Sequence, residues 1–192
     1  MPTNKNKTRY VILGLLNEEH LSGYEIKRII DMRLSFFWNE SFGQIYPELK
    51  KLMLEGLIVA SDQSDKRGKE SKKYEITTQG KIELQEWLKV PVEKELIRYE
   101  ILLKLYFSNE TSSKNMLNHV KEFEINHRKQ RELFDKFESQ LKENIDVHSN
   151  HRQILMVLSF GQKVWDAYAH WCEETIKLLE QVVAEHGGID NE

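Results

Sequence analysis

The sequence predicts a mainly α-helical protein with a small α+β part in its first half. Apolar residues recur at helical spacing over most of the chain, and only three of its 192 residues are proline. Two short β-branched runs flank a glycine-containing turn near residue 68, which predicts a strand hairpin. With 40% hydrophobic and 31% charged residues, the composition is that of a globular, soluble chain. Its length suits one medium domain or two small ones.

Two helices are predicted before residue 40. Residues 8–17 are nearly all apolar, as in a buried helix. A second helix is expected at about 23–34, because Ser22 and Glu25 have the spacing of a capping box. The connection after it holds three bulky aromatic residues at 36–38, which we expect to pack beneath a neighbouring element.

The segment 41–58, SFGQIYPELKKLMLEGLI, predicts a third helix with an abrupt end. Its apolar side chains fall on one face, and Gly56 stands where a left-handed C-cap ends a helix. The other face opens with small and polar groups, and its acids, Glu48 and Glu55, are expected further along. Because a recognition helix enters the major groove by its N-terminal residues, this asymmetry predicts DNA binding. The residues expected to face DNA are Ser41, Gln44, Tyr46, Lys50 and Lys51.

Two strands are expected at 57–63 and 72–77, joined by the tip SDKRGKES. Three helices followed by a hairpin are the order of a winged helix-turn-helix, in which a cationic tip lies along the phosphate backbone. An ordinary solvated turn is the alternative. Residues 1–80 carry 13 Lys/Arg against 11 Asp/Glu, and the remainder 15 against 20, so only the first part suits a polyanion. The basic residues of the hairpin expected to contact DNA are Lys66, Arg67, Lys69 and Lys72.

A fourth helix, capped by Thr77 or Thr78, is expected to end the first domain. The predicted domains are therefore a winged helix-turn-helix at 1–90 and a helical dimerisation and effector domain at 91–192. An apolar helical segment is expected at 97–107.

The second domain is expected to contain two long helices, at about 112–143 and 151–185. Because two long helices with wide apolar faces cannot cover each other fully, we expect a second copy of the chain to pair with them about a two-fold axis. The dimer contacts predicted from the apolar stripe of the last helix are Leu158, Trp165, Cys172 and Leu179.

Other classes of function find less support in the sequence. It has no Gly-rich phosphate loop and no nucleophile elbow, so we expect neither an enzyme nor a cofactor. The pairs His148/His151 and His170/Cys172 lack the spacing of a four-ligand zinc site, so no metal is expected. A protein–protein adaptor built on the helical half is an alternative, which the basic wing argues against. Without a long apolar run or a signal peptide, the chain is expected in the cytoplasm with no membrane partner.

Four segments together resemble the motifs of PadR-type transcriptional regulators. They are 10–16 (YVILGLL), 22–26 (SGYEI), 44–58 (QIYPELKKLMLEGLI) and 73–80 (KYEITTQG). Residues 98–107 (RYEILLKLYF) and the two long helices are similar to the long C-terminal domain of one branch of that family. The resemblance implies DNA binding by the third helix and the wing, dimerisation by the helical domain, and repression of nearby promoters. The wing tip departs from the Arg/Pro-containing form common in the family.

The resemblance also implies a possible ligand, because some members of the family respond to phenolic acids or other small aromatic molecules. We therefore expect a homodimeric repressor that binds a pseudo-palindromic double-stranded operator and is released by a small aromatic acid. The alternative is an activator or repressor that needs no ligand. Aromatic side chains at helical spacing also occur as plain core. Those that could line an effector cavity are Trp38, Trp165, Tyr168 and Trp171.

Overall fold

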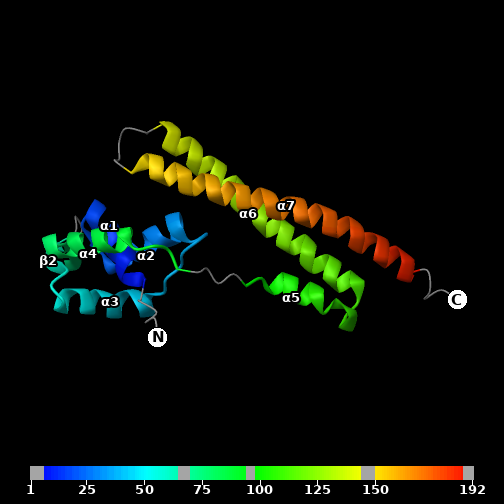
Figure 1. Ribbon diagram of the computed structural model, residues 1–192, viewed down its shortest axis with the longest axis horizontal. Coiled ribbons are helices and arrows are strands. Elements are labelled where there is room, and N and C mark those ends of the chain that lie inside the picture. The colour runs from blue at the N-terminus through cyan, green and yellow to red at the C-terminus, as the bar shows by residue number, and fades with distance from the viewer. Residues whose placement is uncertain (1–6, 65–69, 94–97, 144–149, 188–192) are drawn as a thin grey trace. The chain divides into compact units, whose positions relative to one another are not determined.

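The computed structural model describes residues 7–64, 70–93, 98–143 and 150–187 (Figure 1). The chain divides into two units, Met1–Lys94 and Glu95–Glu192, each with its own core. The predicted boundary between residues 90 and 91 lies just before this division. Within the described residues, no helix combines the length and the apolar character needed to cross a membrane.

The helices of the N-terminal unit follow the predicted order. They are α1 (Thr8–Glu18), α2 (Gly23–Ile29), the π-helix η1 (Ile30–Leu34), α3 (Phe42–Leu54) and α4 (Thr78–Lys89). Ser22 and Glu25 form the predicted capping box of α2, and Thr77 Oγ1 accepts a hydrogen bond from the Gly80 N–H at the start of α4. Gly56 has a φ of 71° directly after α3, which confirms the predicted left-handed stop.

The sheet of this unit has the strand order β1–β3–β2 with antiparallel pairing. Its strands are β1 (Leu21–Ser22), β2 (Ile58–Ser64) and β3 (Glu70–Ile76). The predicted hairpin is β2–β3, with Ile58 opposite Ile76, while β1 adds the pair Leu21 and Tyr74 at the far edge. A strand of two residues is too short to show an alternating pattern, so the sequence did not predict β1. The unit is a winged helix-turn-helix.

One apolar core joins the helices of the N-terminal unit to its sheet. Its largest fully buried side chains are Ile12, Leu13, Ile26, Ile30, Ile45, Leu49, Leu52 and Ile58. The fourth helix closes this core, because Trp87 stacks on Tyr10 of α1 with ring centroids 4.4 Å apart. A Cβ at Gly80 would lie 2.2 Å from the Leu57 carbonyl oxygen. Glycine is therefore required where α4 begins against the sheet.

The C-terminal unit is helical. Its elements are α5 (Glu100–Tyr106), the 3-10 turn η2 (Ser108–Glu110), α6 (Ser113–Glu143) and α7 (His151–Gly187). The two long helices run antiparallel along each other (Figure 1). Met116 and Val120 of α6 are buried against Cys172 of α7, and Ile101 and Leu105 of α5 pack on the same cluster.

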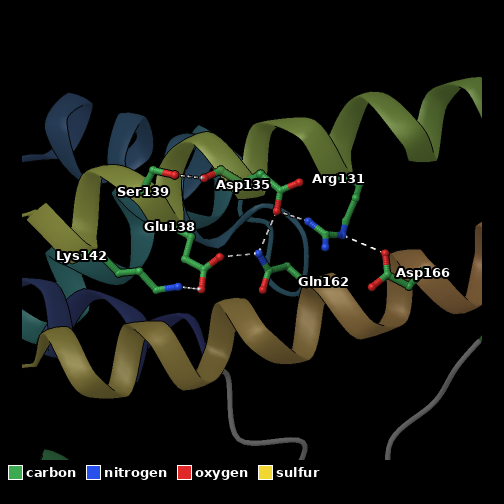
Figure 2. Close-up of polar contacts among 7 residues, drawn as sticks. All are labelled: Arg131, Asp135, Glu138, Ser139, Lys142, Gln162 and Asp166. Carbon is green, nitrogen blue, oxygen red and sulfur yellow. Dashed lines mark hydrogen bonds and ion pairs between the residues drawn. The ribbon is translucent and has the colours of Figure 1, made fainter.

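A polar network fixes the register of α6 against α7 (Figure 2). Arg131 Nε donates to Asp166 Oδ1 at 2.8 Å, and it also pairs with Asp135 on its own helix. Gln162 Nε2 donates to Asp135 Oδ1 and to Glu138 Oε2, both at 3.0 Å. Because these groups are all at least partly exposed to solvent, they contribute more to register than to stability.

Candidate nucleic-acid interface

The third helix separates its side chains into a buried face and an exposed face. Ile45, Leu49 and Leu52 are 0% exposed in the core. Neither Lys50 nor Lys51 forms an ion pair with a side chain that the structure describes, so both ammonium groups are available to a polyanion. The residues in and directly before α3 that the sequence predicted to face DNA are all exposed, namely Ser41, Gln44, Tyr46, Lys50 and Lys51.

Hydrogen bonds between Ser41 and Gln44 hold the first turn of α3. Gln44 Oε1 accepts from the Ser41 backbone N–H at 2.9 Å and from Ser41 Oγ at 2.8 Å. Both lone pairs of the amide oxygen are thereby used, which leaves the Nε2 amino group as the part of Gln44 that can bind elsewhere. A bidentate pair with adenine needs the oxygen as well as the amino group, so it would require this cap to open.

Of the two acids that the sequence predicted on the outward face of α3, only Glu55 is exposed. Glu48 is only 4% exposed, so its placement on the outward face was wrong. Glu55 is exposed but pairs with Arg9 of α1, and the positive charge of Arg9 also acts on Glu48. The positive charge of Arg9 therefore offsets part of the negative charge of these two carboxylates.

The predicted wing residues are placed only in part. Lys66, Arg67 and Lys69 lie outside the described residues. Lys72 of β3 is exposed and opposite Asp62 in the hairpin register. The next residue, Lys73, is turned toward α2, where its Nζ lies 3.6 Å from a carboxylate oxygen of Glu25. Since successive side chains of a strand point to opposite faces, Lys72 points away from α2.

An aromatic group at the start of α3 was not predicted. The Phe42 ring stacks between Tyr24 of α2 and Tyr46 of α3, with centroid separations of 6.5 and 6.0 Å. The Lys27 ammonium lies 5.8 Å from the Phe42 centroid. A Cβ at Gly23 would lie 2.7 Å from Tyr46 Cε1, so this glycine lets Tyr46 pack against α2. The available signal was a phenylalanine directly after the helix N-cap, one turn before Ile45 in the phase of the apolar stripe.

A buried carboxylate directly precedes α3. Glu40 is 4% exposed, and its Oε1 accepts from Thr8 Oγ1 and from Trp38 Nε1, both at 2.8 Å. These bonds hold the segment before α3 onto the start of α1. No sequence pattern predicts them, because Thr8 and Glu40 are far apart in the chain.

Trp38, predicted to line an effector cavity, lines a pocket of about 250 Å³ within the N-terminal unit. Apart from Lys7, whose ammonium pairs with Glu93 at 2.9 Å, its lining is apolar. The other lining residues are Tyr10, Val11, Gly14, Leu15, Leu34, Phe37 and Trp87.

The three other predicted effector residues lie in the C-terminal unit. Trp165 and Tyr168 contact the His127 ring of α6, with centroids 4.7 and 4.8 Å away, and Trp171 contacts Phe123 at 6.0 Å. Desolvation in this cluster lowers the pKa of His127, although its Nδ1 bond to the Phe123 carbonyl acts in the opposite direction. Trp165, Tyr168 and Trp171 are half-buried on α7, where they pack against side chains of α6.

The predicted dimer contacts divide into two groups. Leu158 is 2% exposed and Cys172 0% exposed within the single chain, so both serve the protomer's own core. Their assignment to a dimer face was wrong, because the apolar stripe of α7 is wide enough for α6 to cover part of it. Trp165 and Leu179 are half-buried. Apolar side chains that stay exposed in this unit include Leu102, Leu103, Tyr106 and Phe107 on or next to α5, and Met156, Val157 and Phe160 on α7.

Comparison with known sequences gives matches along both units. Residues 12–86 match the profile of the transcriptional regulator PadR-like family, and residues 97–180 that of the virulence activator alpha C-terminal family. The negative transcriptional regulator PadR of Bacillus subtilis is 43% identical over 101 residues, which are 52% of this chain and 55% of the relative. The chain spans about half the length of the curated relatives it matches, 55% and 44%.

Solved structures match over nearly the whole chain. The crystal structure of Bacillus subtilis PadR in complex with operator DNA is similar with a TM-score of 0.79 and 28% identity, over 89% of this chain and 96% of that one. The structure of Bacillus subtilis PadR with p-coumaric acid is similar with a TM-score of 0.71 and 28% identity, over 90% and 98%.

Proposed function

Because this chain belongs to the PadR-like family of transcriptional regulators, we propose that it is a homodimeric DNA-binding repressor that a small aromatic acid releases from its operator. The observation that carries the DNA-binding part is the two-faced α3. Its inner side anchors the helix in the core, while its outer side presents Gln44, Tyr46, Lys50 and Lys51 on a rigid element. The operator complex of the similar Bacillus subtilis PadR supports this part, and the description of that relative as a negative regulator supports repression.

A salt titration with full-length protein tests the DNA interface. The probe is a duplex selected from a random-sequence pool, with binding followed by fluorescence anisotropy. The double variant Lys50→Ala/Lys51→Ala should bind more weakly and reduce the salt slope by about one for each lost phosphate contact. The matched control Lys129→Ala/Lys177→Ala removes two exposed lysines of the C-terminal unit and should leave the slope unchanged. Equal slopes in all three proteins would contradict this interface.

The homodimer is supported by the apolar side chains that α5 leaves exposed. Leu102, Leu103, Tyr106 and Phe107 are 45%, 60%, 81% and 60% exposed, in a segment of only six residues. An apolar surface of this kind marks a contact site, and a second copy of the chain is the partner that a two-fold operator requires. Pairing two recognition helices also doubles the number of base contacts made by one regulator.

The effector part is supported by the p-coumaric acid complex of the similar PadR and by the aromatic residues of both units. Titrating p-coumaric acid by tryptophan fluorescence, with and without the selected duplex, tests it. A tenfold loss of DNA affinity corresponds to about 1.4 kcal/mol of coupling, and the duplex must weaken ligand binding by the same factor. Binding of the acid that leaves DNA affinity unchanged would favour the ligand-independent regulator.

A further inference from the structure

The first turn of α3 offers few free hydrogen-bonding side chains to a base edge. Ser41 Oγ donates to Gln44, and the Gln44 oxygen is occupied by Ser41. Gly43 has no side chain. The largest side chain that this turn leaves exposed is the Phe42 ring, which is 43% exposed.

The Phe42 ring is held in place rather than free to rotate. It stacks between Tyr24 and Tyr46 with interplanar angles of 12° and 23°. The Lys27 ammonium over the ring adds a cation–π contact at 5.8 Å. A side chain that is already ordered loses little conformational entropy on binding, so this arrangement suits a contact surface.

The charge around the ring indicates its partner. On the outward side of the same helix, Lys50 and Lys51 form no ion pair with a described side chain, and Glu48 is turned into the core. An exposed apolar ring at the start of a helix that carries such cations two turns further along suits the major groove, where phosphates flank base edges and thymine presents a methyl group. Apolar contact with that methyl is a known mode of direct readout for phenylalanine.

We infer that Phe42 reads thymine methyl groups in the operator, as an apolar specificity-determining residue at the start of α3. The inference rests on the proposed DNA binding and adds the chemistry by which the first turn distinguishes bases. Recognition at this position depends on the methyl, and the exposed Gln44 amino group adds a separate hydrogen bond.

Replacing thymine by deoxyuridine removes only the 5-methyl group, so it isolates this contact. The full-length protein first selects a duplex from a random-sequence pool, and each thymine of that duplex is then replaced by deoxyuridine in turn. For at least one thymine in each half-site, wild-type binding should weaken about fourfold, the effect of losing about 0.8 kcal/mol for one buried methyl. In Phe42→Ala the same replacement should change the Kd by less than about 1.5-fold.

The matched control is Leu54→Ala, which truncates an 89% exposed apolar side chain in the last turn of the same helix. It should keep the fourfold sensitivity to the methyl. A wild-type protein indifferent to every replacement, or a sensitivity that persists undiminished in Phe42→Ala, would overturn the inference while leaving DNA binding intact. Failure to select any duplex would instead overturn the proposed function, and this inference with it.

Discussion

The two units of this protein differ in how fully each covers its own apolar surface. In the N-terminal unit, side chains from α1, α2, α3 and the sheet meet in one continuous core. In the C-terminal unit, the fully buried cluster is small, formed by Met116, Val120 and Cys172, while Tyr106 stays 81% exposed. The comparison shows that the first unit buries its apolar side chains in its own core, whereas the second leaves a group of them exposed, which is the surface of the proposed dimer.

The largest expected effect comes from opening the closed core. Leu49→Ala removes a leucine with no exposed surface and should cost about 2–5 kcal/mol of unfolding free energy. Hydrogen-exchange mass spectrometry should show lost protection in α1 and α3, with α6 and α7 unaffected. The control Leu54→Ala should change stability by less than about 0.5 kcal/mol. Lost protection in both units would show that their cores act as one.

The next effect concerns the surface that the C-terminal unit leaves uncovered. Leu103→Glu should remove the burial of a leucine from the dimer, about 1.5–3 kcal/mol for each chain, and add the desolvation of a carboxylate. Sedimentation velocity at micromolar concentration should show a shift from dimer to monomer, with unchanged circular dichroism. Met32→Glu, at a 71% exposed apolar residue of the other unit, is the control. A dimer that survives Leu103→Glu would exclude α5 from the interface.

A smaller effect is expected from a substitution that keeps the role of Gln44 in capping α3 but removes its contact with DNA. Gln44→Glu keeps an oxygen for the Ser41 donors and places negative charge near a helix N-terminus, so stability should stay equal or rise by about 0.3–1 kcal/mol. The same change removes the outward amino group and repels phosphates, so affinity for the selected duplex should fall. Thermal melting measures the change in stability, and fluorescence anisotropy measures the change in DNA affinity. Unchanged affinity would remove Gln44 from the DNA interface.

The smallest effect is a difference in acid sensitivity between the units. Partial burial acts to raise the pKa of Glu25, but hydrogen bonds from Ser22 and the charge of Lys73 together outweigh it and lower this pKa. The pKa of His127 is lowered by desolvation. Since both folded-state values lie below the unfolded ones, each contribution to stability is present at higher pH and is lost as pH falls.

The two losses should begin at different pH, because an unfolded histidine titrates near about 6.5 and an unfolded glutamate near about 4.3. Calorimetry from about pH 8 to 3 should therefore show the C-terminal unit weakening first. His127→Phe should remove the earlier loss and Glu25→Gln the later one. A pH profile that neither substitution alters would assign the acid response to other groups.

The contrast between the units also marks what the sequence could predict. Local signals predicted two features of the N-terminal unit correctly, the Ser22–Glu25 capping box and the helix end at Gly56. Both depend on only a few neighbouring residues. The strand β1 and the π-helix η1 were missed, since tertiary pairing and packing create them. The amphipathic pattern placed α6 and α7 correctly but not the covered part of each stripe.

In the candidate site, too, features set by neighbouring residues were predicted and features set by tertiary packing were not. Helical periodicity identified the exposed side of α3, because only the phase of the apolar stripe is needed. It placed Glu48 wrongly, since the compensating charge comes from Arg9 on another helix. Neither the burial of Glu40 nor the Ser41–Gln44 bond that occupies the glutamine oxygen could be read from spacing alone.

The strict separation of the two faces of α3 has a consequence for how such regulators diversify. Residues that hold the helix in the core, such as Ile45 and Leu49, take no part in its outward surface. Outward positions such as Lys50 and Lys51 can therefore change after gene duplication without unfolding the protein, and paralogues can acquire separate targets. Gln44 is more constrained, because its oxygen caps the helix at Ser41 while its amino group faces outward, so it should accept a narrower set of replacements than Lys50.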